Sequence, residues 1–341
     1  MRQIETKNAV GHILCHDITE IVKGVTKKAR FRKGHIVKEE DIPVLLKLGK
    51  DRLYVWEQTE GMIHENEAAE YLKEITINDN IRASECKEGK IDLFAEIDGL
   101  LKVDIEKLLV VNSSDEMMIA TRHNNMPVKA GDKLLGTRII PLVIEESKMI
   151  EVKEKVGDSP ILKLLPFKKL NAGVVTTGNE VYHKRIEDTF TPVIIDKLKA
   201  YNIEVVEHEI SDDNPENISA KIKAILKKGV DLLICTGGMS VDPDDKTPAA
   251  IKSVADRIIS YGAPVLPGAM FMLAYTSEGL PIMGLPGCVM YCKRTVFDLI
   301  LPRVAAGDPV TKEEISTLGH GGLCLECEDC TYPECSFGKG A

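Results

Sequence analysis

Residues 171–306 predict an α/β fold with a doubly wound, mostly parallel sheet. Short apolar runs alternate there with amphipathic stretches, and most of the runs end in a glycine-rich loop. This alternation is typical of βαβ units, in which each helix returns the chain to a parallel strand. Smaller segments precede this region, α+β over 1–75 and β-rich over 76–170. A linker and a cysteine-rich tail follow over 307–341.

The elements of the second half can be predicted in order. Its strands are AGVVTTG (172–178), IEVVEHEI (203–210), VDLLICTGG (230–238) and LPIMGLPG (280–287). Its helices are TPVIIDKLKAYN (191–202), NPENISAKIKAILKKG (214–229), TPAAIKSVAD (247–256) and VMYCKRTVFDLILPRVAAG (289–307). Thr191 is expected as the N-cap of the first helix, with Pro192 at its first position.

The first half has shorter and less regular patterns. GHILCHDIT (11–19) and RLYVW (52–56) predict strands, and KEEDIPVLLKLGK (38–50) predicts a short helix that Gly49 ends. Further along, KLLVVNSS (107–114), EMMIATR (116–122) and KLLGTRIIPLVI (133–144) predict strands, and helical segments are expected near 92–108.

Composition and charge exclude several classes of function. The net charge of −9 argues against nucleic-acid binding, which needs a basic surface. The basic cluster KKARFRKGH (27–35) is either a solvated face or a phosphate-facing patch. No apolar run approaches the roughly 18 residues of a membrane span, and the N-terminus lacks the apolar core of a signal peptide. We therefore expect a cytoplasmic protein that does not bind membranes.

Five loops are expected at the carboxyl ends of the strands, where open parallel sheets bind ligands. They are TTGNEV (176–181), ISDDNPEN (210–217), CTGGMSVDPDDKTP (235–248), APVLPGAMF (263–271) and GLPGC (284–288). Glycine lets the backbone approach a ligand closely, and successive N–H groups bind anionic oxygen. Any single loop of this kind can be an ordinary turn, but five at one edge favour a ligand pocket.

The third loop places carboxylates beside an expected anion cradle. Backbone amides of Gly237, Gly238, Met239 and Ser240 would hold a phosphate, which Asp242, Asp244 and Asp245 would repel. A Mg²⁺ ion removes this conflict, because Mg²⁺ binds one or two carboxylates together with phosphate oxygens. Asp212 and Asp213 of the neighbouring loop could contribute. The alternative is that these residues are solvated turn formers and N-caps.

Taken together, TTGNEV, SDDNPE, CTGGMSVDPDDKTP, VLPGAMF and GLPG resemble the molybdopterin-binding domain of molybdenum-cofactor biosynthesis proteins. Within that group the chain looks most similar to molybdopterin molybdotransferases, which insert molybdate into adenylylated molybdopterin and release AMP. The resemblance implies catalytic roles for Asp245, Asp242, Glu180 and Asp212, with Mg²⁺ on Asp242 and Asp245. It implies that the ligand contacts Thr177, Gly178, Asn179, Ser211, Asp213, Gly237, Gly238, Met239, Ser240, Pro267, Gly268, Gly284, Leu285, Pro286 and Gly287.

Some positions differ from the family pattern. Asn179 stands where the family has Asp, Ala269 where a basic residue follows the Pro-Gly pair, and the family's C-terminal β-barrel is absent. These differences leave a second function open, a non-catalytic carrier or sensor that delivers the cofactor to a client molybdoenzyme. The expected partners are molybdopterin or its AMP adduct, molybdate and such a client, in a homo-oligomer.

The tail contains a C-x₂-C-x₂-C-x₄-C motif formed by Cys324, Cys327, Cys330 and Cys335. Thiolates at this spacing indicate a Zn²⁺ site or a [4Fe–4S] cluster. A disordered or disulfide-bonded tail is the alternative. Cys288 and Cys292, one helical turn apart, are either half-buried apolar side chains or thiols that take part in the molybdenum chemistry.

Overall fold

The computed structural model describes residues 2–22, 26–55, 60–240, 242 and 245–340. The chain forms two compact units. The first comprises residues 1–96, 103–122 and 131–163, and the second comprises residues 97–102, 123–130 and 164–341. Among the described residues, no helix is long and apolar enough to cross a membrane.

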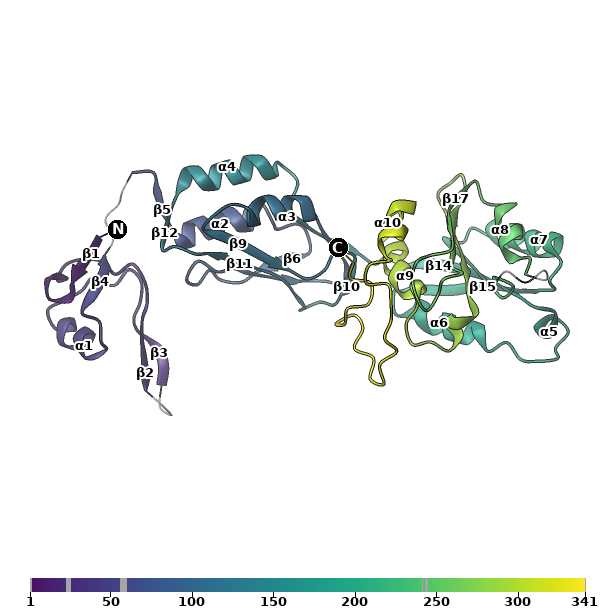
Figure 1. Cartoon of the computed structure of the whole chain (residues 1–341), viewed down its shortest axis with the longest axis horizontal. Coiled ribbons are helices and arrows are strands. Elements are labelled where there is room, and N and C mark those ends of the chain that lie inside the picture. Colours follow the sequence, from purple (N-terminus) through teal and green to yellow (C-terminus); the bar gives the residue numbers. More distant parts are fainter. Residues whose placement is uncertain (1, 23–25, 56–59, 241, 243–244, 341) are drawn as a thin grey trace. The chain divides into compact units, whose positions relative to one another are not determined.

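The first unit begins with two antiparallel strand pairs and a short helix (Figure 1). β1 (Arg2–Glu5) pairs with β4 (Arg52–Val55), β2 (Ile18–Val22) pairs with β3 (Thr26–Phe31), and η1 (Thr6–Asn8) follows β1. Helix α1 (Asp41–Lys47) precedes Gly49 at φ +73°, which confirms the predicted short helix. The strand predicted at 11–19 is wrong, because residues 13 and 14 form only isolated bridges and β2 begins at residue 18.

The rest of the first unit is built on a four-stranded sheet in the order β6-β7-β11-β9. Its strands are β6 (Ile81–Ala83), β7 (Asp92–Ala95), β9 (Met117–Thr121) and β11 (Lys133–Ile139). A strand pair, β5 (Met62–His64) with β12 (Val143–Glu145), and the helices α2 (Glu65–Glu74), α3 (Ile105–Asn112) and α4 (Glu146–Val156) complete it.

Two sequence predictions in this part are wrong. The strand predicted at 107–114 is α3, whose first turn is capped by the Asp104 carboxylate accepting a hydrogen bond from Lys107 N at 3.1 Å. The helix expected near 92–108 is mostly β7 and β8 (Gly99–Val103). β8 lies between β10 (Met126–Val128) and β13 (Leu162–Pro166) in a three-stranded sheet that belongs mostly to the second unit. An apolar run such as 107–111 fits a strand or a helix, so the cap decided its structure.

The second unit contains a six-stranded sheet in the order β15-β14-β16-β19-β18-β17. β14 (Leu170–Thr177), β15 (Ile203–Ser211), β16 (Leu232–Thr236) and β19 (Pro281–Leu285) are parallel. β18 (Met272–Tyr275) runs antiparallel to both of its neighbours, β19 and β17 (Arg257–Tyr261). The predicted doubly wound, mostly parallel sheet is therefore confirmed. The antiparallel pair β17–β18 was not predicted.

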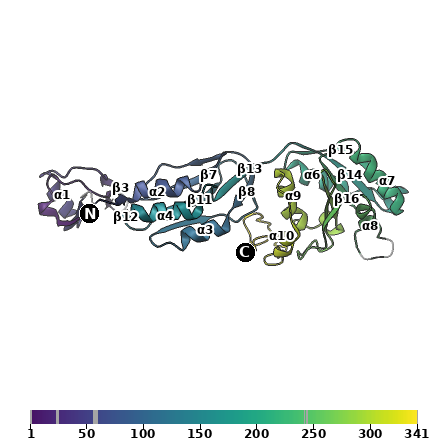
Figure 2. The ribbon, with the colours of Figure 1, turned by 90° about the horizontal axis from the view of Figure 1, so that it is seen from above.

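Helices cover both faces of this sheet (Figures 1 and 2). On one face, α6 (Phe190–Lys199), α9 (Val296–Ala306) and α10 (Lys312–Thr317) bury residues such as Ile194 and Phe297. On the other face, α7 (Pro215–Leu226) and α8 (Thr247–Lys252) bury residues such as Ile222 and Ile251. Two apolar cores thus enclose the sheet and hold its edges in place.

Several helix ends differ from the sequence predictions. The last long helix begins at Val296 rather than near 289, because Thr295 and Asp298 form a capping box there. The 3₁₀ turn η2 (Gly287–Met290) precedes it. Helix α6 begins at Phe190, so Thr191 lies inside the helix and is not its N-cap. Helix α10 lies within the segment that was expected to be a linker.

Gly173→Ala is expected to lower the free energy of unfolding by about 1–3 kcal/mol. A Cβ at this position of β14 would lie 2.2 Å from Cγ2 of Ile225 on α7, so the helix would have to move. Chemical denaturation measures the change. Gly287→Ala is the control, because nothing lies within 4 Å of the added Cβ. Equal losses in the two variants would contradict the close packing of α7 on β14.

Candidate functional site

The parallel strands end at one level of the sheet. Thr177 of β14 pairs with Ser211 of β15, and Thr176 pairs with Thr236 of β16, which pairs in turn with Leu285 of β19. The loops that follow these four strands therefore begin at the same edge, as the sequence predicted. The chain leaves β14 toward β15 on one side and later returns as β16 on the other, so the topological switch point lies between β14 and β16.

The fifth predicted loop reaches this edge from the opposite direction. Residues 263–271 precede β18, whose first residue, Met272, pairs with Gly284 near the end of β19. In this loop, Gly268 has φ +124°, and a Cβ there would lie 2.7 Å from Cγ1 of Val296. Pro267 accepts a hydrogen bond from Val296 N at 3.3 Å. Both residues thus fix the start of α9 beside the edge.

At the switch point the Gly237–Gly238 turn folds back on β14. A Cβ on Gly237, which has φ +81°, would lie 2.2 Å from the backbone oxygen of Thr177. The Thr177 hydroxyl lies 3.0 Å from the Thr247 hydroxyl at the start of α8, and both residues are buried. Only glycine allows this approach, so the two backbones and the start of α8 form one compact feature.

The acidic loop after the glycine pair is fixed from two sides. Asp245 N donates to the backbone oxygen of Asp242 at 2.9 Å, and an Asp245 carboxylate oxygen would lie 3.6 Å from a Cβ on Gly238. The Tyr261 hydroxyl donates to the backbone oxygens of Met239 (2.9 Å) and Ser240 (3.2 Å). Tyr261 was missed because β17 was not predicted. Asp244, which the sequence analysis named, lies outside the described residues.

The other predicted carboxylates contact residues of the loops after β14 and β15. Asp212 accepts hydrogen bonds from the Asn217 side chain at 2.9 and 3.1 Å. Asp213 accepts one from Asn179 N at 2.9 Å, at the start of the short helix α5 (Asn179–Tyr182). The carboxylate of Glu180 would lie 3.0 Å from a Cβ on Gly178. These contacts favour the turn-forming alternative for Asp212 and Asp213.

The rest of the predicted residues form the edge itself. The Met239 side chain is buried, and its Cε would lie 2.5 Å from a Cβ on Gly284, so it anchors the loop in the core. Leu285 is buried at the end of β19, and Pro286 precedes η2, which begins at Gly287.

Two buried hydroxyls at this edge have no protein partner. Among the buried side chains of the described residues, Ser211 Oγ and Thr236 Oγ1 are the oxygens that have no hydrogen-bond partner. They are the terminal residues of β15 and β16. Because unpaired buried hydroxyls are costly, their position at the strand ends is consistent with a polar ligand or water there.

A polar network that the sequence did not reveal lies beside the end of β14. The Asp188 carboxylate accepts hydrogen bonds from Thr191 Oγ1 (2.6 Å), Thr176 Oγ1 (3.1 Å) and the backbone N–H of Phe190 (3.0 Å). Burial alone would raise the pKa of Asp188, but the hydrogen bonds from Thr191 and its neighbours outweigh burial and lower it. Asp188 thus replaces the predicted Thr191 cap of α6.

The four tail cysteines line a common pocket, described below. Within the described part of the chain, no three His, Cys, Asp or Glu side chains are grouped closely enough to hold a metal ion.

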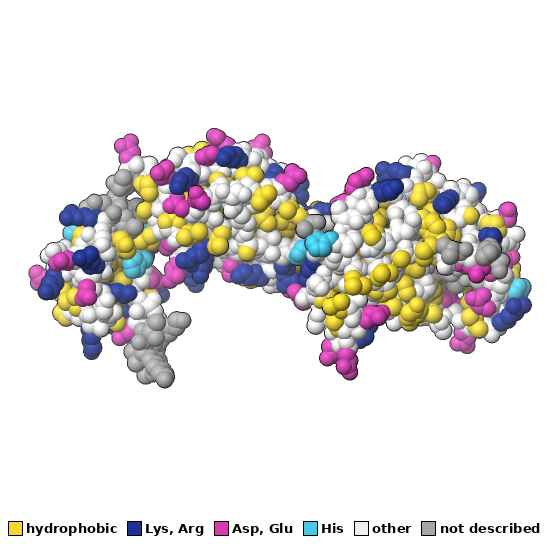
Figure 3. Space-filling view, viewed as in Figure 1, with side chains coloured by type: hydrophobic (Ala, Val, Ile, Leu, Met, Phe, Trp, Pro, Cys, Tyr) yellow, Lys and Arg dark blue, Asp and Glu magenta, His cyan; other side chains and the backbone are white. Residues whose placement is uncertain are grey.

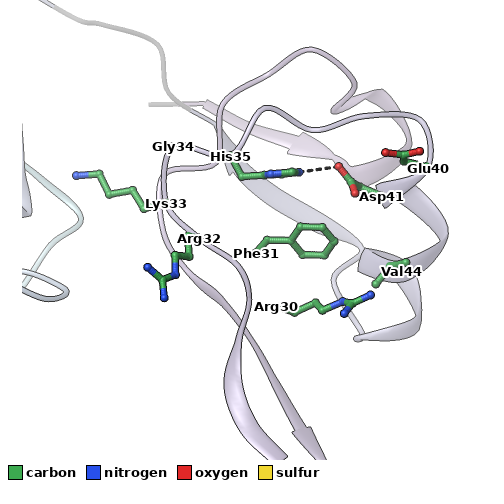
Figure 4. Close-up of a pocket in the computed structure, with 9 residues that line it drawn as sticks. All are labelled: Arg30, Phe31, Arg32, Lys33, Gly34, His35, Glu40, Asp41 and Val44. Atoms are coloured by element: carbon green, nitrogen blue, oxygen red, sulfur yellow. Dashed lines mark hydrogen bonds and ion pairs between the residues drawn. The ribbon is translucent and has the colours of Figure 1, made fainter.

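A second pocket lies in the first unit, on the basic cluster (Figure 4). His35 Nε2 lies 2.7 Å from the Asp41 carboxylate, and Lys33 Nζ lies 2.5 Å from Nδ1 of His64. Figure 4 shows Arg30 and Arg32 directed to opposite sides of the ribbon. The cationic groups do not converge, so the structure favours the solvated face over the phosphate-facing patch.

Comparison with known proteins gives matches to parts of the chain. A family model described as "Probable molybdopterin binding domain" matches residues 173–306, and a domain of unknown function (DUF8806) matches residues 3–57. A CinA-like protein of Mycobacterium sp. (strain MCS) is 35% identical over 86 residues, 25% of this chain and 20% of the relative. A CinA-like protein of Mycobacterium avium (strain 104) is 33% identical over 94 residues, 28% of this chain and 22% of the relative. The chain thus matches about a fifth of the length of these relatives.

Similar solved structures include the molybdopterin biosynthesis enzyme MoaB from Thermus thermophilus. It has 22% identity and a TM-score of 0.36, over 41% of this chain and 98% of that one. The tungsten cofactor synthesizing protein MoaB from Pyrococcus furiosus has 20% identity and a TM-score of 0.32, over 41% and 89% of the two chains.

The strand ends and the glycine turn define an α/β domain with a doubly wound sheet, a class in which ligands bind at the carboxyl edge. Residues 173–306 belong to the molybdopterin-binding domain family of molybdenum cofactor biosynthesis.

Asp188→Asn is expected to lower the free energy of unfolding at pH 7 by about 1–3 kcal/mol, because it replaces a carboxylate that accepts several partly buried hydrogen bonds. The pKa of Asp188 is lower in the folded state than its ordinary value, so its contribution is present above about pH 4 and is lost as the pH falls through the folded-state pKa. Urea unfolding from pH 7 to acid measures this. Asp196→Asn, an exposed position on α6, is the control. A stability difference that stays constant with pH would contradict the assignment.

Proposed function

We propose that the second unit binds molybdopterin, in its adenylylated form, and inserts molybdate with release of AMP. The observation that carries this proposal is the Gly237–Gly238 turn at the switch point, where the backbone comes closest to the end of β14. The family of residues 173–306 supplies the ligand class. Successive N–H groups in such a turn bind phosphate oxygens, so we assign the phosphate of the ligand to residues 237–240.

We assign Mg²⁺, when bound, to the carboxylates of Asp242 and Asp245, which lie on the loop after this turn. Mg²⁺ would neutralise the phosphate charge, and one or two carboxylates suffice because Mg²⁺ takes its other ligands from phosphate and water. Asp245 is the better candidate, since its carboxylate lies close to Gly238. Glu180, close to Gly178, would lie across the switch point on the opposite loop. Catalysis would then consist of positioning and charge neutralisation while molybdate displaces AMP.

A carrier or sensor of the finished cofactor is the second candidate. Two observations favour it: Asp212 is hydrogen-bonded within its own loop, and Ala269 supplies no positive charge after the Pro-Gly pair. In this case the protein would bind the pterin without releasing AMP and pass it to a client molybdoenzyme. For either function we propose a cytoplasmic homo-oligomer.

Gly237→Ala is expected to weaken molybdopterin binding at least tenfold, which corresponds to about 1.4 kcal/mol. The added Cβ would meet the Thr177 backbone 2.2 Å away and displace the turn. Gly229→Ala is a matched control, because Gly229 has nearly the same φ (+80° against +81°) but nothing within 4 Å of the added Cβ. Anaerobic fluorescence titration measures affinity for both variants. Unchanged affinity in Gly237→Ala would refute the assigned site.

Asp245→Asn is expected to lower AMP release at least tenfold while the pterin still binds, because the variant loses a Mg²⁺ ligand and keeps the glycine turn. The assay mixes protein, adenylylated molybdopterin, molybdate and Mg²⁺, and measures AMP by chromatography. Asp79→Asn, an exposed change in the first unit, is the control. AMP release by the unmodified protein supports the transferase, whereas tight binding without AMP supports the carrier. Full AMP release by Asp245→Asn would refute the role of Asp245.

A further inference from the structure

The cysteine-rich tail is packed on the core of the second unit. Phe337 is 2% exposed, and the Tyr332 hydroxyl donates to the backbone oxygen of Asp298 on α9 at 3.0 Å. The Arg294 guanidinium lies over the Tyr332 ring, with Cζ 4.8 Å from the ring centre. Tyr332 lies between the third and fourth cysteines and Phe337 just beyond the fourth, so the motif has a fixed place on the domain.

The start of the tail runs beside the 263–271 loop. Cys324 N donates to the backbone oxygen of Leu266, and Leu266 N donates to the backbone oxygen of Gly322, each at 2.8 Å. Leu266 and Leu323 form a parallel bridge between these hydrogen bonds. The first cysteine of the motif is therefore joined through the backbone to one of the five loops at the ligand-binding edge.

The middle of the tail lies on the loop that follows β19. Lys293 Nζ donates to the backbone oxygens of Cys327 and Glu328, and Sγ of Cys292 lies 3.9 Å from a carboxylate oxygen of Glu326. Arg294 and Cys330 line the same pocket. Tyr291 separates residues 292–294 from η2, so the tail contacts the chain that continues from the edge loop after β19.

The thiols of Cys324, Cys327, Cys330 and Cys335 line one pocket beside these contacts. All four are unpaired cysteines, and Cys327 and Cys330 are exposed. Thiolates at short spacing bind Zn²⁺ or an iron–sulfur cluster. Four thiolates around one zinc ion leave a net charge of about −2, and the ammonium of Lys293 and the guanidinium of Arg294 lie where they would offset it. Because no three donors in the described chain are grouped closely enough to hold an ion, loading requires the four cysteines to move closer together within the pocket.

We propose that Cys324, Cys327, Cys330 and Cys335 hold a thiophilic metal centre, zinc or iron–sulfur, which ties together two loops at the edge of the sheet. The loops are 263–271, through Leu266, and 284–292, through Cys292 and the adjacent Lys293. The inference of a metal centre does not depend on the proposed function, whereas its effect on pterin binding rests on that function. The occupied centre would hold both loops in the geometry that binds the pterin.

The surroundings of the pocket are apolar. Leu323 and Leu325 are 60% and 71% exposed, and Leu266 and Tyr291 on the two loops are 56% and 74% exposed. Figure 3 shows hydrophobic side chains gathered on this face of the second unit. An apolar surround limits the access of water and chelating solutes to metal–thiolate bonds.

The first experiment is elemental analysis of protein purified without oxygen and reconstituted separately with Zn²⁺ or with iron and sulfide. We expect about one zinc, or about four irons with a visible absorption band, per chain. Cys327→Ser/Cys330→Ser is expected to lose the metal, and the half-buried Cys86→Ser in the first unit is expected to retain it. The exposed pair is chosen because its replacement leaves the packed Tyr332 and Phe337 in place.

Absence of metal after both reconstitutions would overturn the proposal, as would full metal content in Cys327→Ser/Cys330→Ser. If the double variant fails to fold, removal of metal from the unmodified protein with a chelator gives the same comparison. The metal that the loaded protein contains, zinc or iron, identifies the kind of centre.

The second experiment measures loop order and pterin affinity in the loaded and chelated states. Metal loading is expected to slow limited proteolysis and amide exchange within 263–271 and 284–292, and to raise pterin affinity at least threefold. Equal exchange in both states would refute the link between the loops. If the metal orders the loops but the pterin binds neither state, the proposed function fails and the metal centre remains.

Discussion

The pairing of β14 with β15 and β16 at their carboxyl ends is the constraint on which the site depends. Because Thr177, Ser211 and Thr236 end their strands at one level, the loops that follow must emerge side by side. A shift of one residue would move each of these side chains to the other face of the sheet and place the hydroxyls in the wrong core. The two apolar cores fix the register, so packing on both faces of the sheet determines the geometry at its edge.

Glycine has a different use at three positions of the second unit. At Gly237 it permits contact between two backbones, and at Gly173 it permits α7 to lie against β14. At Gly268 it allows the start of α9 to approach the loop before β18. None of these positions tolerates a Cβ without movement of a neighbour. The edge is therefore shaped mainly by close backbone approaches, and the acidic side chains are added on loops that those approaches hold in place.

The parallel part of the fold could be predicted from the sequence because apolar strands and amphipathic helices alternate there with clear glycine ends. The predictions failed where two conformations suit the same residues. The largely apolar run at 107–114 fits either a strand or a helix, and the Asp104 cap favoured the helix. No amphipathic helix separates β17 from β18, so the sequence did not predict this strand pair. The contact of Tyr261 with the loop after the glycine turn was therefore missed. The Asp188 network was likewise hidden, since Thr176 lies on β14, twelve residues before Asp188, and the two side chains meet only through folding.

The burial of Phe337 has a consequence for biosynthesis. This side chain belongs to the same apolar cluster as Phe297 and Ile300 of α9, although it lies beyond the cysteine motif. The ribosome must therefore synthesise and release the chain beyond Phe337 before that face of the sheet can be fully covered. The second unit would complete its folding only after translation of the tail, and until then its unfinished face would be open to chaperones.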